Sequence, residues 1–180
     1  MNTIGKKGLA IIMHFEQLHD GDLSQIGLQP KMCPAGIWTV GYGRALTDKK
    51  GNFLRGEQNK AKAYALYPSL TPFEAEQMLI EDGFEYSQKV YNLFTSLKLS
   101  LMQHQFDALV SFTYNCGIGA LYNYEKKKEM AVLRAIRSNR GIANAFGLWV
   151  NARGKVLPGL VRRRKSEATL YLTGEVEFYT

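Results

Sequence analysis

The four residues Thr71-Pro72-Phe73-Glu74 are the strongest local signal in the sequence, because together they specify where a helix begins. Thr71 can cap the helix, Pro72 suits the first helical position, and Glu74 can complete a capping box with Thr71. The helical pattern then continues to about Phe94. Its candidates for burial are Leu79, Val90, Tyr91 and Phe94. A long helix here divides the chain into a segment before it and a segment after it.

In the segment before this helix, the sequence pattern predicts one further helix and a short strand. Apolar residues recur at about the helical period over residues 3–18, so that helix should end close to Glu16. Gly, Asp, Gln and Pro are frequent over residues 19–32, which predicts a loop. The β-formers of residues 37–40 stop at Gly41-Tyr42-Gly43, which predicts a strand entering a turn. Residues 44–70 are mostly polar and predict a hairpin tip with an irregular excursion.

The segment after the long helix predicts only helices. One runs from Met102 to Asn115 and stops at Gly117-Ile118-Gly119. Two or three shorter helices follow, including residues 129–137 and 159–172. Strands and helices are therefore segregated along the chain rather than alternating, which indicates the α+β class, with a small β-containing N-terminal lobe and an all-helical C-terminal lobe.

Composition and charge narrow the class of protein. The chain has 180 residues, of which 46% are hydrophobic and 22% charged, as expected for one globular domain or two small lobes. Residues 121–180 hold 12 basic and 5 acidic residues and account for the whole net charge of +7. This bias indicates either an anionic partner, such as nucleic acid, a membrane surface or a bacterial wall, or a solvated face. The apolar run Leu9–Met13 is too short to span a membrane, and we expect no export signal.

Several common functional motifs are missing from the sequence. It contains no P-loop, no G-x-G-x-x-G fingerprint and no H-E-x-x-H motif. The three histidines, at positions 14, 19 and 104, lack metal-ligand spacing, and the thiols of Cys33 and Cys116 suggest no disulfide framework. Residues 162–165 (RRRK) could grip phosphates, but no aromatic residues alternate with them as in single-strand binders. We therefore expect neither a metal nor a cofactor.

Glu16 is the most informative single residue. It falls where an apolar helix ends, beside Phe15 and Leu18, so the helix dipole and its apolar neighbours both favour a protonated carboxyl. Glycosidases need such a group to protonate the leaving oxygen. The alternative is an ordinary surface glutamate. For the group opposite Glu16, the candidates are the nearby Asp20 and Asp22 and the more distant Cys33.

Three segments together give the chain a family resemblance. The order of Glu16, Cys33 and Thr39, with Thr39 opening a Gly-x-Gly turn, resembles the active-site motif of the phage-type lysozymes, the glycoside hydrolase family that includes the T-even phage enzyme. Residues 105–121 (QFDALVSFTYNCGIGAL) resemble the central helix of that family, and residues 154–174 its penultimate region. The resemblance thus covers nearly the whole chain.

This resemblance implies a fold and an activity. The fold would be one lysozyme domain over residues 1–180, with an N-terminal lobe of about residues 15–75, a C-terminal lobe of about residues 76–180 plus the first helix, and a cleft between them. The activity would be that of an endolysin, a bacteriolytic muramidase that cleaves the β-1,4 bond between N-acetylmuramic acid and N-acetylglucosamine with inversion. Glu16 would be the general acid, and Cys33 the second catalytic residue. Thr39 would position water or hold the geometry of Cys33, and Asn115 would bind sugar.

The chain departs from the family pattern at three places, of which one is the longer and more polar segment of residues 45–70. The family usually has a shorter spacing between its first two catalytic residues, and we assign the extra residues here to an inserted loop, His19–Ile26. Asp20 and Asp22 then belong to that loop, which favours Cys33 as the partner of Glu16. The Gly-x-Gly turn is followed by Arg44, where the family commonly has histidine.

The resemblance also implies partners and a location. The partner would be peptidoglycan glycan strands, with no nucleic acid, no stable membrane insertion and a monomeric state. The protein would accumulate in the host cytoplasm until a holin releases it to the periplasm or cell wall. The alternative function is a catalytically impaired wall-binding or virion-associated structural protein.

Overall fold

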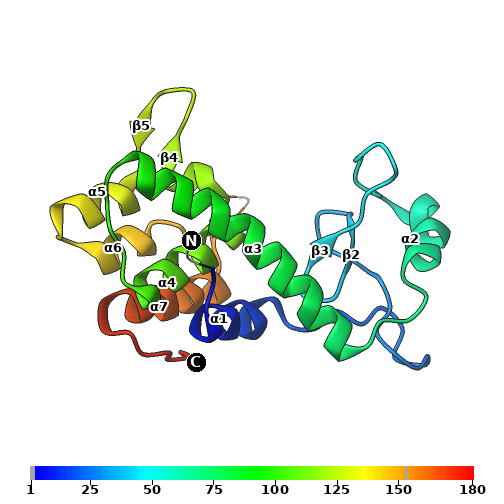
Figure 1. Cartoon of the computed structure of the whole chain (residues 1–180). Helices are drawn as coiled ribbons and strands as arrows, with labels where there is room; N and C mark the ends of the chain where they lie inside the picture. Colours follow the sequence, from blue (N-terminus) through cyan, green and yellow to red (C-terminus); the bar gives the residue numbers. More distant parts are fainter. Residues whose placement is uncertain (1–2, 153) are drawn as a thin grey trace. The chain divides into compact units, whose positions relative to one another are not determined.

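The computed structural model describes residues 3–152 and 154–180, and the chain forms two compact units (Figure 1). The first, which we call the helical unit, comprises Met1–Phe15 and Gly83–Thr180. The second, which we call the sheet unit, comprises Glu16–Asp82. Each unit has its own hydrophobic core. The sequence predicted that the N-terminal lobe ends at about residue 75. In the structure the sheet unit ends at Asp82, inside the long helix α3 (Pro72–Ser96).

The sheet unit is built on a three-stranded antiparallel sheet. Its strands are β1 (Lys31–Met32), β2 (Trp38–Val40) and β3 (Arg44–Ala45), in the order β1-β2-β3. All three residues of β2 are buried, as the run of β-formers predicted, and Trp38 and Val40 belong to the core with Leu46 and Leu54. The predicted strand is therefore confirmed.

One helical element of the sheet unit was not expected. Residues 44–70 were predicted to form a hairpin tip with an irregular excursion. The antiparallel bridge between Thr47 and Phe53 confirms the hairpin tip. The excursion, however, contains a 3-10 turn, η1 (Glu57–Asn59), that leads into helix α2 (Lys60–Leu66). Helix α2 is rich in Ala and Lys, which are good helix formers, but it buries only Ala63. A helix with so narrow an apolar stripe shows almost no helical periodicity, so the sequence pattern missed it.

The helical unit is arranged around helix α4 (Gln103–Cys116), in which eight consecutive residues, Phe106–Thr113, are buried. The other helices of this unit are α1 (Lys6–Glu16, whose last residue belongs to the sheet unit), α5 (Ala131–Ser138), α6 (Ile142–Gly147), α7 (Pro158–Thr173) and most of α3. The helices predicted over residues 102–115, 129–137 and 159–172 are confirmed within two residues.

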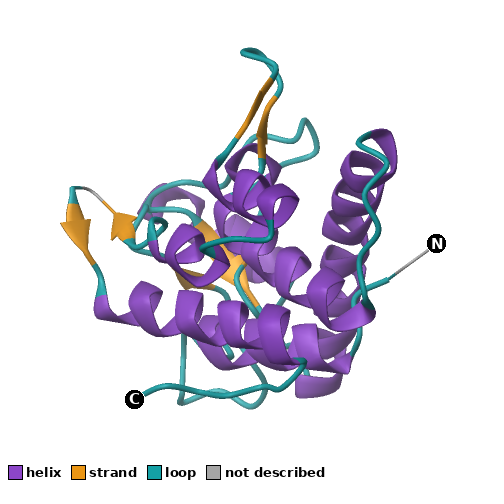
Figure 2. Cartoon of the chain, turned by 90° about the vertical axis from the view of Figure 1, so that its left-hand side faces the viewer, coloured by secondary structure: helices purple, strands orange, loops and turns teal. Residues whose placement is uncertain are grey.

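The helical unit also contains short strands that the sequence did not predict. One hairpin pairs β4 (Tyr122–Asn123) with β5 (Lys128–Glu129), next to the 3-10 turn η2 (Ile118–Ala120). The other pairs β6 (Asn151–Ala152) with β7 (Lys155–Val156). Figure 2 shows how small both hairpins are beside the helices. Two-residue strands are too short to carry a recognisable alternation of polar and apolar residues.

Burial along α3 agrees with the prediction except at one residue. Leu79, Val90 and Phe94 are buried, as expected. Tyr91 is 36% exposed, so the prediction that it is buried was wrong. One residue adds about 100° around a helix, so Tyr91 faces away from the stripe formed by Val90 and Phe94.

The arginine run on α7 is largely internal. Arg163 and Arg164 are buried and both pair with Glu167, which is fully buried: Arg163 Nε lies 3.1 Å from Glu167 Oε1, and Arg164 Nε lies 2.8 Å from Glu167 Oε2. Ser111 Oγ of α4 donates a further hydrogen bond of 2.9 Å to Glu167 Oε1. Two of the four basic residues thus stabilise the α4–α7 packing and are not available to grip phosphates.

We predict that Glu167→Gln destabilises the protein by about 3 kcal/mol or more, because it removes the buried carboxylate that pairs with the guanidinium groups of Arg163 and Arg164. Urea denaturation measures this change in the free energy of unfolding. The control is Glu85→Gln, which removes an exposed ion pair with Lys89 and should cost about 0.5 kcal/mol or less. Similar losses in the two variants would contradict the structural role of the buried cluster.

Candidate active site

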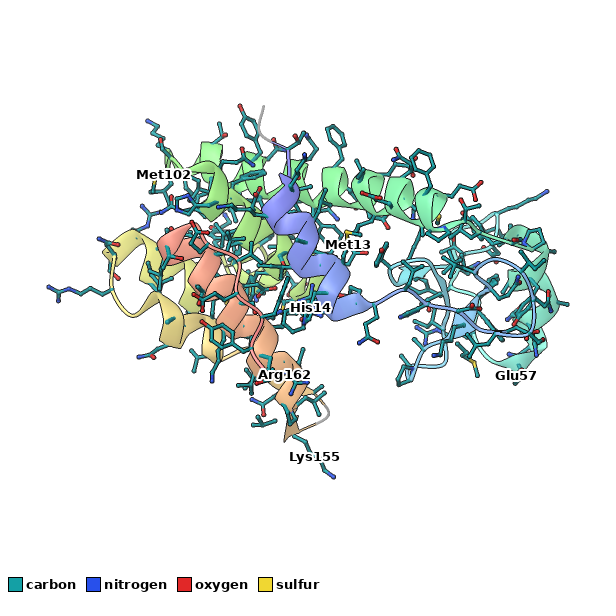
Figure 3. All side chains as sticks on the ribbon, turned by 90° about the horizontal axis from the view of Figure 1, so that it is seen from below. Met13, His14, Glu57, Met102, Lys155 and Arg162 are labelled. Carbon is teal, nitrogen blue, oxygen red and sulfur yellow. The ribbon has the colours of Figure 1, made fainter. Side chains whose placement is uncertain are left out.

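Glu16 is the last residue of α1, the helix that also carries Met13 and His14 (Figure 3). Gln17 follows in a left-handed conformation (φ 56°), which ends the helix. The Glu16 carboxylate lies close to the Gly-Tyr-Gly turn, since a Cβ atom built on Gly43 would be 3.4 Å from Glu16 Oε2. Gly43 has φ 87°, which also favours glycine. The turn thus approaches the carboxylate with a residue that has no side chain.

Cys33 opens the tight turn that joins β1 to β2. Its carbonyl accepts a hydrogen bond of 2.8 Å from Gly36 N, and its own N–H donates one of 2.8 Å to the carbonyl of Ile37. Gly36 has φ 75°, as the last residue of such a three-residue hairpin loop requires. The Cys33 thiol is half-buried. The turn therefore fixes the thiol at one end of the strand that carries Thr39.

Thr39 is the central residue of β2 and is paired with Lys31 of β1. Its side chain is buried, and Oγ1 donates a hydrogen bond of 2.9 Å to the Lys31 carbonyl. Oγ1 also lies 2.8 Å from His19 Nδ1. The Thr39 hydroxyl is therefore held from two sides.

His19 is the residue that the sequence analysis missed. We had placed it at the start of an inserted loop, yet its ring contacts Thr39 and its N–H donates a hydrogen bond of 2.8 Å to the Gly41 carbonyl. Burial lowers the pKa of His19, and Lys31 lowers it further, while the charge of Glu16 and a hydrogen bond to the Glu16 backbone raise it. Its position three residues after Glu16 was the only signal in the sequence that could have found it.

Asp20 and Asp22 serve the loop in which they lie. Asp20 Oδ1 accepts hydrogen bonds from the N–H groups of Asp22 (3.1 Å) and Gln29 (3.3 Å). The Asp22 carboxylate accepts bonds from the N–H and hydroxyl of Ser24 and from Gln25 Nε2, and the bonds from Ser24 lower the pKa of Asp22 most. Both carboxylates thus stabilise turns of the Asx type.

Arg44 links the Gly-x-Gly turn to α3. Its Nη2 lies 2.8 Å from Asp82 Oδ1 and 3.0 Å from Glu81 Oε2, and it donates a bond of 2.6 Å to the carbonyl of Met78. Arg44 Nε donates a further bond to Asp82 Oδ2. The residue that stands where the family commonly has histidine therefore anchors the turn through charge-assisted hydrogen bonds.

Asn115 lies near the end of α4, in the helical unit. Its side-chain oxygen accepts a hydrogen bond of 3.0 Å from Arg164 Nη2, and Arg164 is itself paired with Glu167. The same guanidinium contacts Cys116, whose pKa is raised by burial despite the arginine charge. The buried cluster thus orients the Asn115 amide.

The described residues show neither a metal-binding cluster nor a membrane-spanning helix. Among residues 3–152 and 154–180, no group of three or more His, Cys, Asp or Glu side chains is arranged to hold a metal ion. In the same part of the chain, no helix has the length and apolar character needed to cross a bilayer.

Comparisons with known proteins define the class. Residues 24–167 match the phage lysozyme family. The chain is 33% identical over 175 residues to the endolysin of Bacillus phage B103, covering 96% of this chain and 55% of that relative. It is 30% identical over 172 residues to the endolysin of Acyrthosiphon pisum secondary endosymbiont phage 1, covering 93% and 97%. The chain thus spans about half the length of the Bacillus phage relative and nearly all of the second.

Solved structures agree with this class. The muramidase domain of SpmX from Asticaccaulis excentricus is 30% identical, with a TM-score of 0.66 and coverage of 96% of this chain and 99% of that one. The endolysin from Escherichia coli O157:H7 phage FAHEc1 is 28% identical, with a TM-score of 0.67 and coverage of 98% and 97%.

The chain belongs to the phage lysozyme family, and the predicted α+β lysozyme-like fold is confirmed. Cys33, Thr39 and Asn115 lie within the matched residues, whereas Glu16 precedes them.

We predict that His19 titrates below its ordinary value of about 6.5, because burial disfavours the imidazolium. Below about pH 6.5 the unfolded chain then binds more protons than the folded one, so the free energy of unfolding should fall as the pH is lowered through this window. NMR titration measures the pKa of His19. Denaturation at several pH values measures how the free energy of unfolding depends on pH.

The control for this titration is Glu16→Gln, which should lower the His19 pKa further, since the Glu16 charge raises it. His19→Asn should flatten the dependence of stability on pH in the same window. A midpoint above 6.5 in the unmodified protein would contradict the burial of the ring.

Proposed function

We propose that this protein is an endolysin-type muramidase that hydrolyses the β-1,4 bond between N-acetylmuramic acid and N-acetylglucosamine in bacterial peptidoglycan, causing lysis of the host cell. The observation that carries the proposal is the sheet unit of a phage lysozyme family member, in which Glu16 lies beside the Gly-Tyr-Gly turn and Cys33 and Thr39 lie on one hairpin. The relatives named endolysin and muramidase support it.

In the proposed mechanism, Glu16 is the general acid that protonates the glycosidic oxygen as the bond breaks. Gly43 has no side chain of its own, and the position that a Cβ would take lies 3.4 Å from Glu16 Oε2, so the leaving group would approach the carboxylate from that side. Glu16 loses its proton to the leaving oxygen in this step and would take one up from solvent afterwards, while the attacking water would release its proton to solvent on the opposite face of the sugar.

On the other side of the sugar, Cys33 and Thr39 would orient the attacking water. A thiol is a weak hydrogen-bonding group, so its contribution would be mainly geometric, whereas the hydroxyl of Thr39 is a strong acceptor. A water that enters opposite the leaving group inverts the anomeric centre, so the first product would carry an α hemiacetal.

The remaining site residue is a proposed sugar ligand. The oxygen of Asn115 is occupied by Arg164, so its amide N–H groups are directed by that bond and could donate to a sugar hydroxyl or acetamido oxygen. The buried pair of Arg164 with Glu167 would fix this orientation.

Charge supports attraction to the wall. Arg163 and Arg164 are buried, whereas the lysines at positions 126–128, which end the β4–β5 turn and begin β5, are exposed. Figure 1 shows this hairpin projecting from the helical unit. Anionic wall and membrane surfaces would concentrate such a protein near its substrate. We further propose that it acts as a monomer and reaches the wall from the host cytoplasm through a holin.

The test uses purified sacculi and measures released reducing ends, with mass spectrometry of the products. Glu16→Gln should lower the rate by about 10²–10⁴-fold, the usual contribution of a general acid. Cys33→Ser should cost far more activity than Asp20→Ala or Asp22→Ala, because the two aspartates stabilise the loop. NMR of fresh product should show the α anomer first.

Several outcomes would contradict the proposal. Equal rates for the unmodified protein and Glu16→Gln would remove the general acid. A greater loss from the aspartate variants than from Cys33→Ser would mean that the loop supplies the second catalytic group. Binding to sacculi without new reducing ends would indicate the alternative, a wall-binding protein without catalysis.

A second prediction concerns the space beside Glu16. Gly43→Ala and Gly51→Ala should each cost about 1 kcal/mol of stability, because both glycines have left-handed φ angles, 87° and 83°. Only Gly43→Ala places a methyl group against the Glu16 carboxylate, since no described atom lies within 4 Å of a Cβ at Gly51. Rates on sacculi should therefore fall at least tenfold for Gly43→Ala only. Equal rates in the two variants would contradict the close approach of Gly43 to the Glu16 carboxylate.

A further inference from the structure

His19 connects two parts of the candidate site in the sheet unit. It follows Glu16 by three residues, and the charge of Glu16 acts on its ring by raising the pKa of His19. The ring nitrogen Nδ1 lies 2.8 Å from Thr39 Oγ1, and the main-chain N–H donates to the Gly41 carbonyl. The residue thus connects the segment that follows α1 with the middle of β2 through its ring, and with Gly41 through its main chain.

The hydrogens of this contact can be assigned by counting. The Thr39 hydroxyl has one hydrogen, and it is donated to the Lys31 carbonyl at 2.9 Å. Oγ1 can therefore only accept from His19, so Nδ1 carries a proton and donates it. Both the neutral Nδ1–H tautomer and the imidazolium satisfy this requirement.

These two hydrogen bonds fix the orientation of the Thr39 hydroxyl group. Its hydrogen points to Lys31, one lone pair accepts from His19, and one lone pair is left. A water next to Thr39 must then donate a hydrogen to that lone pair, which turns the water's own lone pairs away from Thr39. This is the orientation that a nucleophilic water needs.

We propose that His19 is a positioning residue of the hydrolytic site, whose Nδ1–H holds the Thr39 hydroxyl as a hydrogen-bond acceptor for the attacking water. This inference rests on the proposed muramidase activity. It assigns His19 no proton transfer, and it differs from a purely structural role, in which His19 would only attach the following loop to Gly41. That attachment uses the main chain, so side-chain substitutions keep it.

The experiment measures kcat and KM on sacculi for His19→Ala, His19→Asn, Thr39→Val and the double variant His19→Ala with Thr39→Val. His19→Ala should lower kcat by about 10- to 100-fold, the range expected when a reacting group loses its position, with KM within about twofold. His19→Asn should restore most of kcat, because the asparagine amide places an N–H donor close to the position of Nδ1.

The double variant tests whether His19 acts through Thr39. In the Thr39→Val background, His19→Ala should change kcat by less than about twofold, because the acceptor that it holds is already missing. His104→Ala on α4 is the control for removal of a histidine elsewhere, and circular dichroism establishes that each variant is folded.

The pH profile separates positioning from base catalysis. Both protonation states of His19 donate through Nδ1, so the acid limb of kcat should be the same in His19→Asn as in the unmodified protein. The charged groups that act on the ring, Glu16 and Lys31, are unchanged in this comparison. Loss of the acid limb in His19→Asn would overturn the proposal in favour of a general base.

Further outcomes would also overturn the proposed role of His19. Unchanged kcat in His19→Ala, no recovery in His19→Asn, or an equal loss in the Thr39→Val background would each overturn the role of His19, while activity that depends on Glu16 would leave the proposed function standing. If the unmodified protein releases no reducing ends from sacculi, the proposed function and this inference fall together.

Discussion

The hydrogen bonding of β2 is the constraint on which the sheet unit depends. Its three residues are all buried, and Thr39 at the centre pairs with β1 on one side and β3 on the other. A buried hydroxyl must find partners, and Thr39 finds them in Lys31 and His19. The same strand continues into the Gly-Tyr-Gly turn that lies beside Glu16. The packing of this short strand thereby helps to position Thr39, His19 and the turn beside Glu16.

In the helical unit, the corresponding element is the buried cluster of Glu167 with Arg163 and Arg164. Removing three charges from water is costly, and hydrophobic residues of similar size often stabilise a core as well or better. The cluster here also forms hydrogen bonds to Ser111 and Asn115, so it sets the register of α7 against α4. We interpret it as a determinant of geometry, because it also orients the Asn115 amide near the end of α4.

Local signals in the sequence predicted the parts of the fold that depend on local chemistry. The capping box at Thr71 and the β-formers before Gly41 act over a few residues, and the structure has the predicted elements. The burial of Arg163 and Arg164 was not predicted, because a periodic pattern treats charge as surface, whereas a carboxylate on the next turn allows burial. His19 was missed because its contact with Thr39 joins residues twenty apart, and only the path of the loop brings them together.

That loop is attached at both of its ends. His19 is bonded to Gly41, and Leu28 forms a two-way backbone bridge with Leu70, through bonds of 2.7 Å and 3.0 Å. Between these attachments, Leu23 and Ile26 are almost fully exposed, so the middle of the loop contributes little to the core. The free energy of loop closure rises only slowly with length, so extra residues in this exposed middle cost little. A change of length before His19 would instead move the imidazole away from Thr39. Added residues in the exposed middle of the loop therefore cost little free energy, whereas added residues before His19 would disturb its contact with Thr39.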